Sequence, residues 1–158
     1  MGVYKVADVI DVARMVLRDL GSASTMKLQK IVYYSQAYHL VEHDEALFDS
    51  RIEAWRNGPV VPSLYDRHAH EFVISDGFLG DFLPESVSDE EMATISRVVS
   101  RLKDKTGQEL SAMTHSEDPW IEARVGLSPL DIGNKEITRE SIKSYYKSRL
   151  GDHVVFSN

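Results

Sequence analysis

Histidines at helical spacing are the first residues of this chain whose types could support chemistry. His39 and His43 are four residues apart, the spacing at which two histidines of one helix bind a metal ion. Metal-dependent hydrolases with this spacing carry a glutamate between the histidines as a base, whereas Glu42 directly precedes His43 here. His68 and His70 are two residues apart and cannot share one helical face. These departures favour structural histidines, and no metal ligand is predicted.

Acyl transfer is a second kind of chemistry that residue types alone would allow. Ser111 and His115 are four residues apart, and Asp118 follows three residues later. A nucleophilic serine needs a strained turn or an adjacent base, and nothing in the surrounding sequence marks Ser111 in this way. Cysteine is absent, which excludes thiol nucleophiles and thiolate zinc sites. We therefore predict no catalytic residue, no cofactor and no enzyme; an enzyme with a histidine-bound metal remains as a less favoured hypothesis.

Two lysines at the start of a predicted helix suggest recognition instead. Lys27 and Lys30 lie in the first turns, where the helix dipole disfavours cations by about 0.3–1 kcal/mol each. One interpretation is that an acidic partner or a phosphate requires them there. The other is that they are solvated and that their alkyl stems cover apolar surface. The sequence leaves both open.

Aromatic and basic residues near an Asn-Gly pair form the second candidate for recognition. Trp55 and Arg56 directly precede Asn57, and Tyr65 follows in the next predicted helix. Tryptophan, tyrosine and arginine are enriched at the centres of protein interfaces. If Ala54 points into the core, Trp55 points outward, and the sequence does not decide between the two faces. The residues predicted to bind a partner are Lys27, Lys30, Trp55, Arg56, Asn57 and Tyr65.

The elements that must position these residues are mostly helices. Apolar residues at helical spacing predict an amphipathic helix over 6–20 that ends at Gly21. A wider apolar arc predicts a central helix that begins after Ser24 or Thr25 and stops near 42–44. The other expected elements are strands at 47–48 and 52–55, a turn at 57–58, a helix from Pro62 to about residue 70, a third strand at 72–74, a loop at 76–87, a helix after the Ser88–Glu91 capping box, and helices at 108–114, from 118 and from 138. The predicted fold class is mainly α (α+β): a compact helical domain with a small antiparallel β-hairpin inserted after the second helix.

Composition and charge narrow the function classes. The 158 residues correspond to one ordinary domain, and we expect a single domain over 1–158. The formal net charge of -7 is opposite to that of proteins that hold nucleic acid through phosphates. A basic run at Arg139, Lys143 and Lys147 nevertheless keeps a DNA-binding regulator as an alternative. No apolar run is long enough for a membrane span and no signal-peptide core is present, so we expect no membrane partner and a cytoplasmic location.

The spaced motifs of this chain resemble the Panacea antitoxin domain family, which includes SocA-like antitoxins and phage-associated GepA-like proteins. The motifs are Lys27–Lys30, Tyr33–Tyr34, Gln36–Leu40, Leu47–Phe48, Ile52–Arg56, Gly58–Pro62 and Tyr65, followed by Leu110, Thr114–His115, Glu117–Trp120 and Ala123–Arg124. The resemblance extends over about 5–146. The chain departs from the family where Ala37 stands in place of a frequent glycine and Asn57 in place of an aromatic residue.

The resemblance implies an antitoxin of a bacterial or prophage toxin–antitoxin system that neutralises its toxin by direct protein–protein binding. A variant mechanism in SocA-like members is that of an adaptor that delivers the toxin to a ClpXP-type protease. Family members are paired with unrelated toxins, so the toxin's identity does not follow, and a homo-oligomer stays open. We expect the loop at 72–84 to be particular to this protein and to add selectivity. The C-terminal tail at 151–158 either packs on the body or hangs free as a degradation handle.

Overall fold

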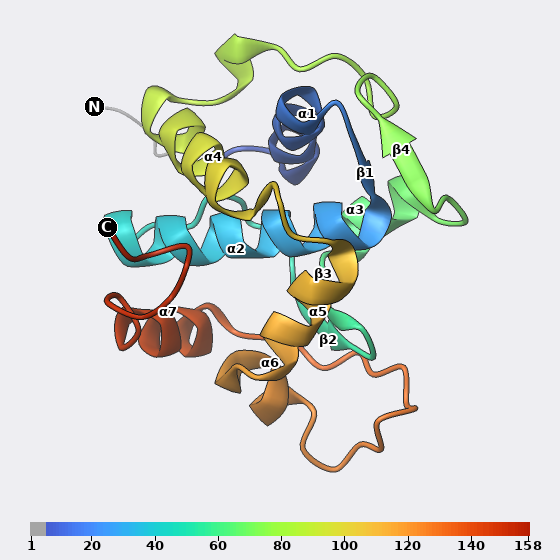
Figure 1. The fold of residues 1–158 in the computed structure, drawn as a ribbon, viewed down its shortest axis with the longest axis vertical. Helices are drawn as coiled ribbons and strands as arrows, with labels where there is room; N and C mark the ends of the chain where they lie inside the picture. The colour runs from blue at the N-terminus through green and yellow to red at the C-terminus, as the bar shows by residue number, and fades with distance from the viewer. Residues whose placement is uncertain (1–5) are drawn as a thin grey trace.

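The structure, a computed structural model, describes residues 6–158 and is built from helices arranged around one central helix (Figure 1). Residues 1–5 of the expected domain lie outside the described residues. The helices are α1 (Val9–Leu20), α2 (Thr25–His43), α3 (Pro62–His68), the 3-10 helix η1 (Pro84–Ser86), α4 (Asp89–Leu102), α5 (Gly107–His115), α6 (Asp118–Ala123) and α7 (Arg139–Lys147). The strands are β1 (Ser22–Ser24), β2 (Glu53–Trp55), β3 (Gly58–Val60) and β4 (Val73–Ser75). These elements confirm the predicted fold class.

Helix α2 is the centre of the core. It packs against α1 and α4 on one side and against α5 and α7 on the other (Figure 1). Every residue from Leu28 to Ala37 is buried, so the helix is covered around its whole circumference. The wide apolar arc of its sequence predicted this burial. Because α2 is enclosed, the polar side chains on it must find partners inside the protein.

Helix ends follow the signals in the sequence. Gly21 has φ 81° and donates its N–H to the carbonyl of Leu17, which ends α1 as predicted. Ser24 caps α2 by accepting from the N–H of Lys27. Both hydrogen bonds of the Ser88–Glu91 capping box are present at the start of α4.

The hairpin differs from the prediction in its strand partners. β2 pairs with β3 in antiparallel register, Ala54 opposite Pro59, whereas the expected strand at 47–48 does not pair with 52–55. The N–H of Leu47 instead donates to Oε1 of Gln36 (2.7 Å), and Phe48 forms a parallel bridge with Ala7. A buried glutamine thus supplies the partner that a second strand would have supplied.

A second two-stranded sheet joins β1, the connection between α1 and α2, to β4, which follows α3. β4 pairs with β1, with Ile74 opposite Ala23. The third strand predicted at 72–74 is present one residue later, and it lies in this separate sheet. Helix α3 ends at His68, short of the expected residue 70, because Ala69 leaves the helical conformation.

The C-terminal tail packs on the body. Val155 is fully buried and Phe156 nearly so. Arg97 Nε and Arg101 Nη1 donate to the tail carbonyls of Val155 (3.1 Å) and Val154 (3.0 Å). Of the two alternatives for the tail, the structure has the packed one. Among residues 6–158, no helix combines the length and the apolar character required to cross a bilayer.

Candidate functional site: a pocket beside the hairpin

A buried glutamine fixes the hairpin and α3 against α2. Oε1 of Gln29 accepts from the N–H of Val61 (2.9 Å), and its Nε2 donates to the carbonyl of the same residue (3.3 Å). The Nε2 group also lies 3.0 Å from Nε2 of His68. Burial lowers the pKa of His68, which leaves its ring neutral and able to accept this bond. Since these bonds join α2 to the end of β3 and to α3, the three elements form a fixed frame.

This frame borders an open pocket of about 170 Å³ next to the hairpin turn, which we call the hairpin pocket. One face of α2, the hairpin turn, α3 and one residue of a later loop contribute its walls. The lining residues are Thr25, Met26, Gln29, Lys30, Trp55, Arg56, Asn57, Val60, Tyr65, His68 and Ile132.

Lys30 is an ionisable residue buried inside the protein, which overturns the interpretation of a solvated lysine. Its side chain is 1% exposed, and Nζ donates to the carbonyl of Pro59 (3.1 Å). Burial lowers the pKa of Lys30 from 10.5 to about 7. Gly58 allows this approach, because with φ 120° a Cβ there would lie 2.5 Å from Cε of Lys30.

Trp55 lies on the outer face of the hairpin, which answers the question that the sequence left open. Ala54 is fully buried, so its neighbour points the other way. The indole N–H of Trp55 donates to Glu53 (2.9 Å), and its ring meets Tyr65 edge-on with centroids 4.9 Å apart. The side chains of Arg56 and Asn57 are exposed at the turn. An aromatic pair with a basic and an amide neighbour therefore forms the rim of the pocket.

The structure brings together five of the six predicted contact residues around this one pocket. Lys27 is the exception, since its Nζ donates to the carbonyl of Lys103 (2.5 Å) at the end of α4. It lies one turn of α2 before Lys30 and points to a different part of the protein.

A loop that the sequence analysis did not single out lies next to the pocket. The exposed fractions of Val125, Leu130 and Ile132 are 75%, 78% and 65%. Arg124 holds this 125–132 loop in place. Its Nη1 donates to the carbonyls of Ala54 (3.2 Å) and Ile132 (2.8 Å), and its Nη2 to those of Ser128 (3.0 Å) and Asp131 (2.7 Å). Apolar side chains held outward on an ordered loop are typical of a protein contact surface. The apolar residues within 125–132 are the feature of the sequence that could have identified this loop.

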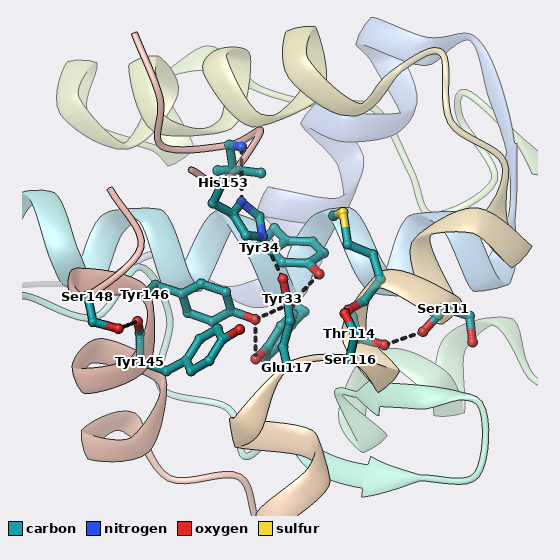
Figure 2. Close-up of polar contacts among 12 residues, drawn as sticks. Tyr33, Tyr34, Ser111, Thr114, Ser116, Glu117, Tyr145, Tyr146, Ser148 and His153 are labelled. Atoms are coloured by element: carbon teal, nitrogen blue, oxygen red, sulfur yellow. Dashed lines mark hydrogen bonds and ion pairs between the residues drawn. The ribbon is translucent and has the colours of Figure 1, made fainter. Parts of the chain in front are cut away.

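A buried polar cluster fastens α5, α6, α7 and the tail to α2 (Figure 2). Oε1 of Glu117 accepts from the hydroxyls of Tyr34 and Tyr146, both at 2.6 Å, and its Oε2 lies 2.7 Å from Nε2 of His153. The hydroxyl of Tyr33 is 3.0 Å from that of Tyr146. Burial raises the pKa of Tyr34 and Tyr146 well above the ordinary value, so both hydroxyls keep their protons. The cluster is a structural anchor for the part of the chain that carries the 125–132 loop.

The residues considered as metal ligands or as a nucleophile make structural contacts. Nδ1 of His39 lies 2.8 Å from Oγ1 of Thr94, and burial lowers the pKa of His39 to about 4. Within residues 6–158 no three histidine or acidic side chains are grouped as a metal site would require. Ser111 donates to the carbonyl of Asn57 (2.5 Å), and His115 stacks on Trp120 with ring centroids 3.9 Å apart.

The basic run on α7 is largely engaged by acids. Arg139 donates to Asp49 (3.0 Å), and Lys143 pairs with Asp44. Lys147 is exposed. Pairing removes most of the positive field that phosphates would need.

A family model described as SocA-like antitoxin, Panacea domain, matches residues 28–121, more than half of the chain. The match contains α2 from Leu28 onward, the hairpin, α3, β4, α4, α5 and most of α6, and it confirms the resemblance drawn from the sequence motifs. Comparison with curated proteins and with solved structures gave no significant match.

Proposed function

Because this chain belongs to the Panacea-domain family of SocA-like antitoxins, we propose that it is a cytoplasmic antitoxin that neutralises its toxin by binding it directly. The contact surface is the rim of the hairpin pocket together with the 125–132 loop. This surface contains Trp55, Arg56, Asn57 and Tyr65. No bond is made or broken at its side chains, so the protein acts as a binding partner rather than as an enzyme.

The observation that carries the proposal is the convergence of predicted contact residues on one preformed surface. Trp55 and Tyr65 are fixed against each other, and Arg124 fixes the neighbouring apolar loop. A surface that is ordered before binding loses little conformational entropy when the partner arrives. Ile132 lines the pocket and is also a member of the loop, so the two parts are continuous. Such continuity supports one contact area that covers the toxin's active surface.

Charge supports an acidic contact on the toxin. The chain carries a net charge of -7, yet the hairpin pocket is lined by Lys30 and Arg56 and by no aspartate or glutamate. Arg56 is the exposed cation of this lining, and it favours a partner whose own contact area is acidic. Electrostatic complementarity therefore adds orientation to the contact made by the aromatic rim.

The two alternative functions have less support. A DNA-binding regulator would use α7, where Arg139 and Lys143 are paired with acids. A protease adaptor would need a segment that the protease can grasp, and the tail is held by Arg97 and Arg101. The segment 72–84, which contains β4 and the loop after it, exposes Phe72 and Phe78, and we propose that it adds selectivity between toxins.

The test is co-expression with the protein encoded by the adjacent gene, followed by growth measurement and co-purification. We expect the wild type to restore growth and to co-purify with that protein. The double variant Trp55→Ala/Arg56→Gln should do neither, whereas Lys147→Gln, an exposed lysine on α7, should behave as the wild type. Absence of both rescue and complex for the wild type would refute the proposal.

A further inference from the structure

The ammonium group of Lys30 has fewer partners than a buried charge requires. It has three N–H donors, and Nζ donates to one carbonyl, that of Pro59. Within residues 6–158 no carboxylate lies within ion-pair distance of it. A buried charge without a counter-ion costs free energy that a neutral residue of the same shape would not cost. Packing alone therefore does not explain why a lysine is buried at this position.

The hairpin pocket around Lys30 has the lining expected for an anionic ligand that carries a short alkyl chain. Lys30 and the exposed Arg56 are the cations in the lining, and no lining residue is acidic. The rest of the wall is largely apolar and includes Met26, Val60 and Ile132. The volume of about 170 Å³ exceeds the space that one water molecule needs. A carboxylate at the end of a short alkyl chain would match both the cation and the apolar wall.

We propose that the hairpin pocket binds a carboxylate group next to Lys30, and that an aspartate or glutamate side chain of the bound toxin supplies it. This inference rests on the proposed function for the source of the carboxylate, but not for the pocket itself. A carboxylate carries one charge, which the Lys30 ammonium neutralises, and Arg56 at the rim can donate to its second oxygen. Inorganic phosphate has no alkyl portion to contact the apolar wall of Met26, Val60 and Ile132, which favours the carboxylate.

Binding should be linked to protonation. In the free protein the pKa of Lys30 is about 7, because burial disfavours its charged form. A carboxylate in the pocket favours the charged form and raises this pKa. The other groups that face Lys30 are His68 on α3 and His115 on α5, whose pKa values are lowered first by burial and then by Lys30, and Arg56 on the turn. None of these is an anion, so none opposes the effect.

Propionate, which reproduces the end of a glutamate side chain, is the first probe. The titration of the Lys30 amine is followed by NMR with and without propionate, and with propionamide as the neutral match. Propionate should raise the pKa of Lys30 above about 8, and propionamide should leave it unchanged. Lys30→Met should lose propionate binding at least about tenfold, whereas Lys27→Met should retain it. An unchanged Lys30 titration, or inorganic phosphate binding as tightly as propionate, overturns the carboxylate site.

The second arm uses the product of the adjacent gene and identifies the source. Its affinity for the wild type should fall as pH rises from 7 to 9, by up to about tenfold per pH unit, because binding takes up a proton. Lys30→Met should bind it more weakly and without this dependence. Equal binding by wild type and Lys30→Met overturns the toxin as source. If the wild type does not bind the adjacent gene product, the proposed function fails. The propionate titration still tests the carboxylate site independently.

A third variant guards against loss of folding. If circular dichroism shows that Lys30→Met is unfolded, Arg56→Gln replaces it, since the side chain of Arg56 is exposed and its loss leaves the core intact. Weaker propionate binding by Arg56→Gln, by a few-fold, supports the proposal. Unchanged binding by a folded Arg56→Gln overturns the arrangement in which both cations face the ligand.

Discussion

Replacing Lys30 by methionine should stabilise the free protein at neutral pH. Methionine keeps much of the shape of the lysine stem but carries no charge that must be buried. The pKa of Lys30 falls from 10.5 to about 7 on folding, and each pKa unit corresponds to about 1.4 kcal/mol. Integrated to pH 7, the buried ammonium costs about 4 kcal/mol, and at pH 9 about 2 kcal/mol. The carbonyl of Pro59 loses its donor in the variant, which costs about 1–3 kcal/mol at either pH.

The sign of the pH dependence follows from proton counting. Between pH 7 and 10.5 the unfolded state holds the Lys30 proton and the folded state has released it, so wild-type stability rises with pH. The variant lacks this contribution. Its advantage of roughly 1–3 kcal/mol at pH 7 should therefore shrink by about 2 kcal/mol at pH 9. The raised pKa values of Tyr33, Tyr34 and Tyr146 affect stability only nearer their ordinary value of 10, above the two measured pH values of 7 and 9.

Urea denaturation followed by tryptophan fluorescence at the two pH values measures this difference, with circular dichroism as a second probe. Lys27→Met is the matched control, because its ammonium donates to Lys103 from a partly exposed position. The control should follow the wild type at both pH values. A Lys30→Met variant that differs from the wild type by the same free energy at pH 7 and pH 9 would refute the buried, partly deprotonated lysine.

Three further changes test the frame of the site. Gly58→Ala should destabilise the fold by at least about 2 kcal/mol, through backbone strain and a clash with Lys30, whereas Gly21→Ala, with open space around it, should cost about 1 kcal/mol; equal costs in thermal unfolding would contradict the clash. Glu117→Ala should cost about 3–5 kcal/mol by removing the shared acceptor of two tyrosines and His153, and a change below about 1 kcal/mol would count against the cluster as an anchor. Arg124→Ala should raise amide hydrogen exchange across the 125–132 loop, and unchanged exchange would show that other contacts hold the loop.

Local features of the fold were predictable because they depend on neighbouring residues. The capping box at Ser88 and the left-handed residue Gly21 are complete within four residues of sequence, and both are present. The wide apolar arc of α2 correctly predicted a central helix. The alternation of side chains along β2 links Trp55 to Ala54, so the burial of Ala54 places Trp55 on the outer face.

Contacts between residues far apart in the sequence could not be predicted from local patterns. The segment at 47–48 has residue types typical of a strand, but the N–H of Leu47 donates to the side chain of Gln36, eleven residues earlier. Lys30 resembles a surface lysine in sequence, and only the approach of Gly58 and Pro59 places its ammonium inside. The sequence feature that could have indicated this burial is the presence of polar residues on a helix whose other residues are apolar on all sides. Such a helix is enclosed by the protein, so its polar residues are buried too.

Hydrogen exchange of the free protein and of its complex with the adjacent gene product locates the contact surface. Binding should slow exchange at 53–66 and at 125–133, around the hairpin pocket and the apolar loop. The α1–α4 face on the opposite side of α2 should exchange as in the free protein (Figure 1). Slowed exchange confined to α1 and α4, with no change around the pocket, would show that the toxin binds elsewhere than at the hairpin pocket and the 125–132 loop.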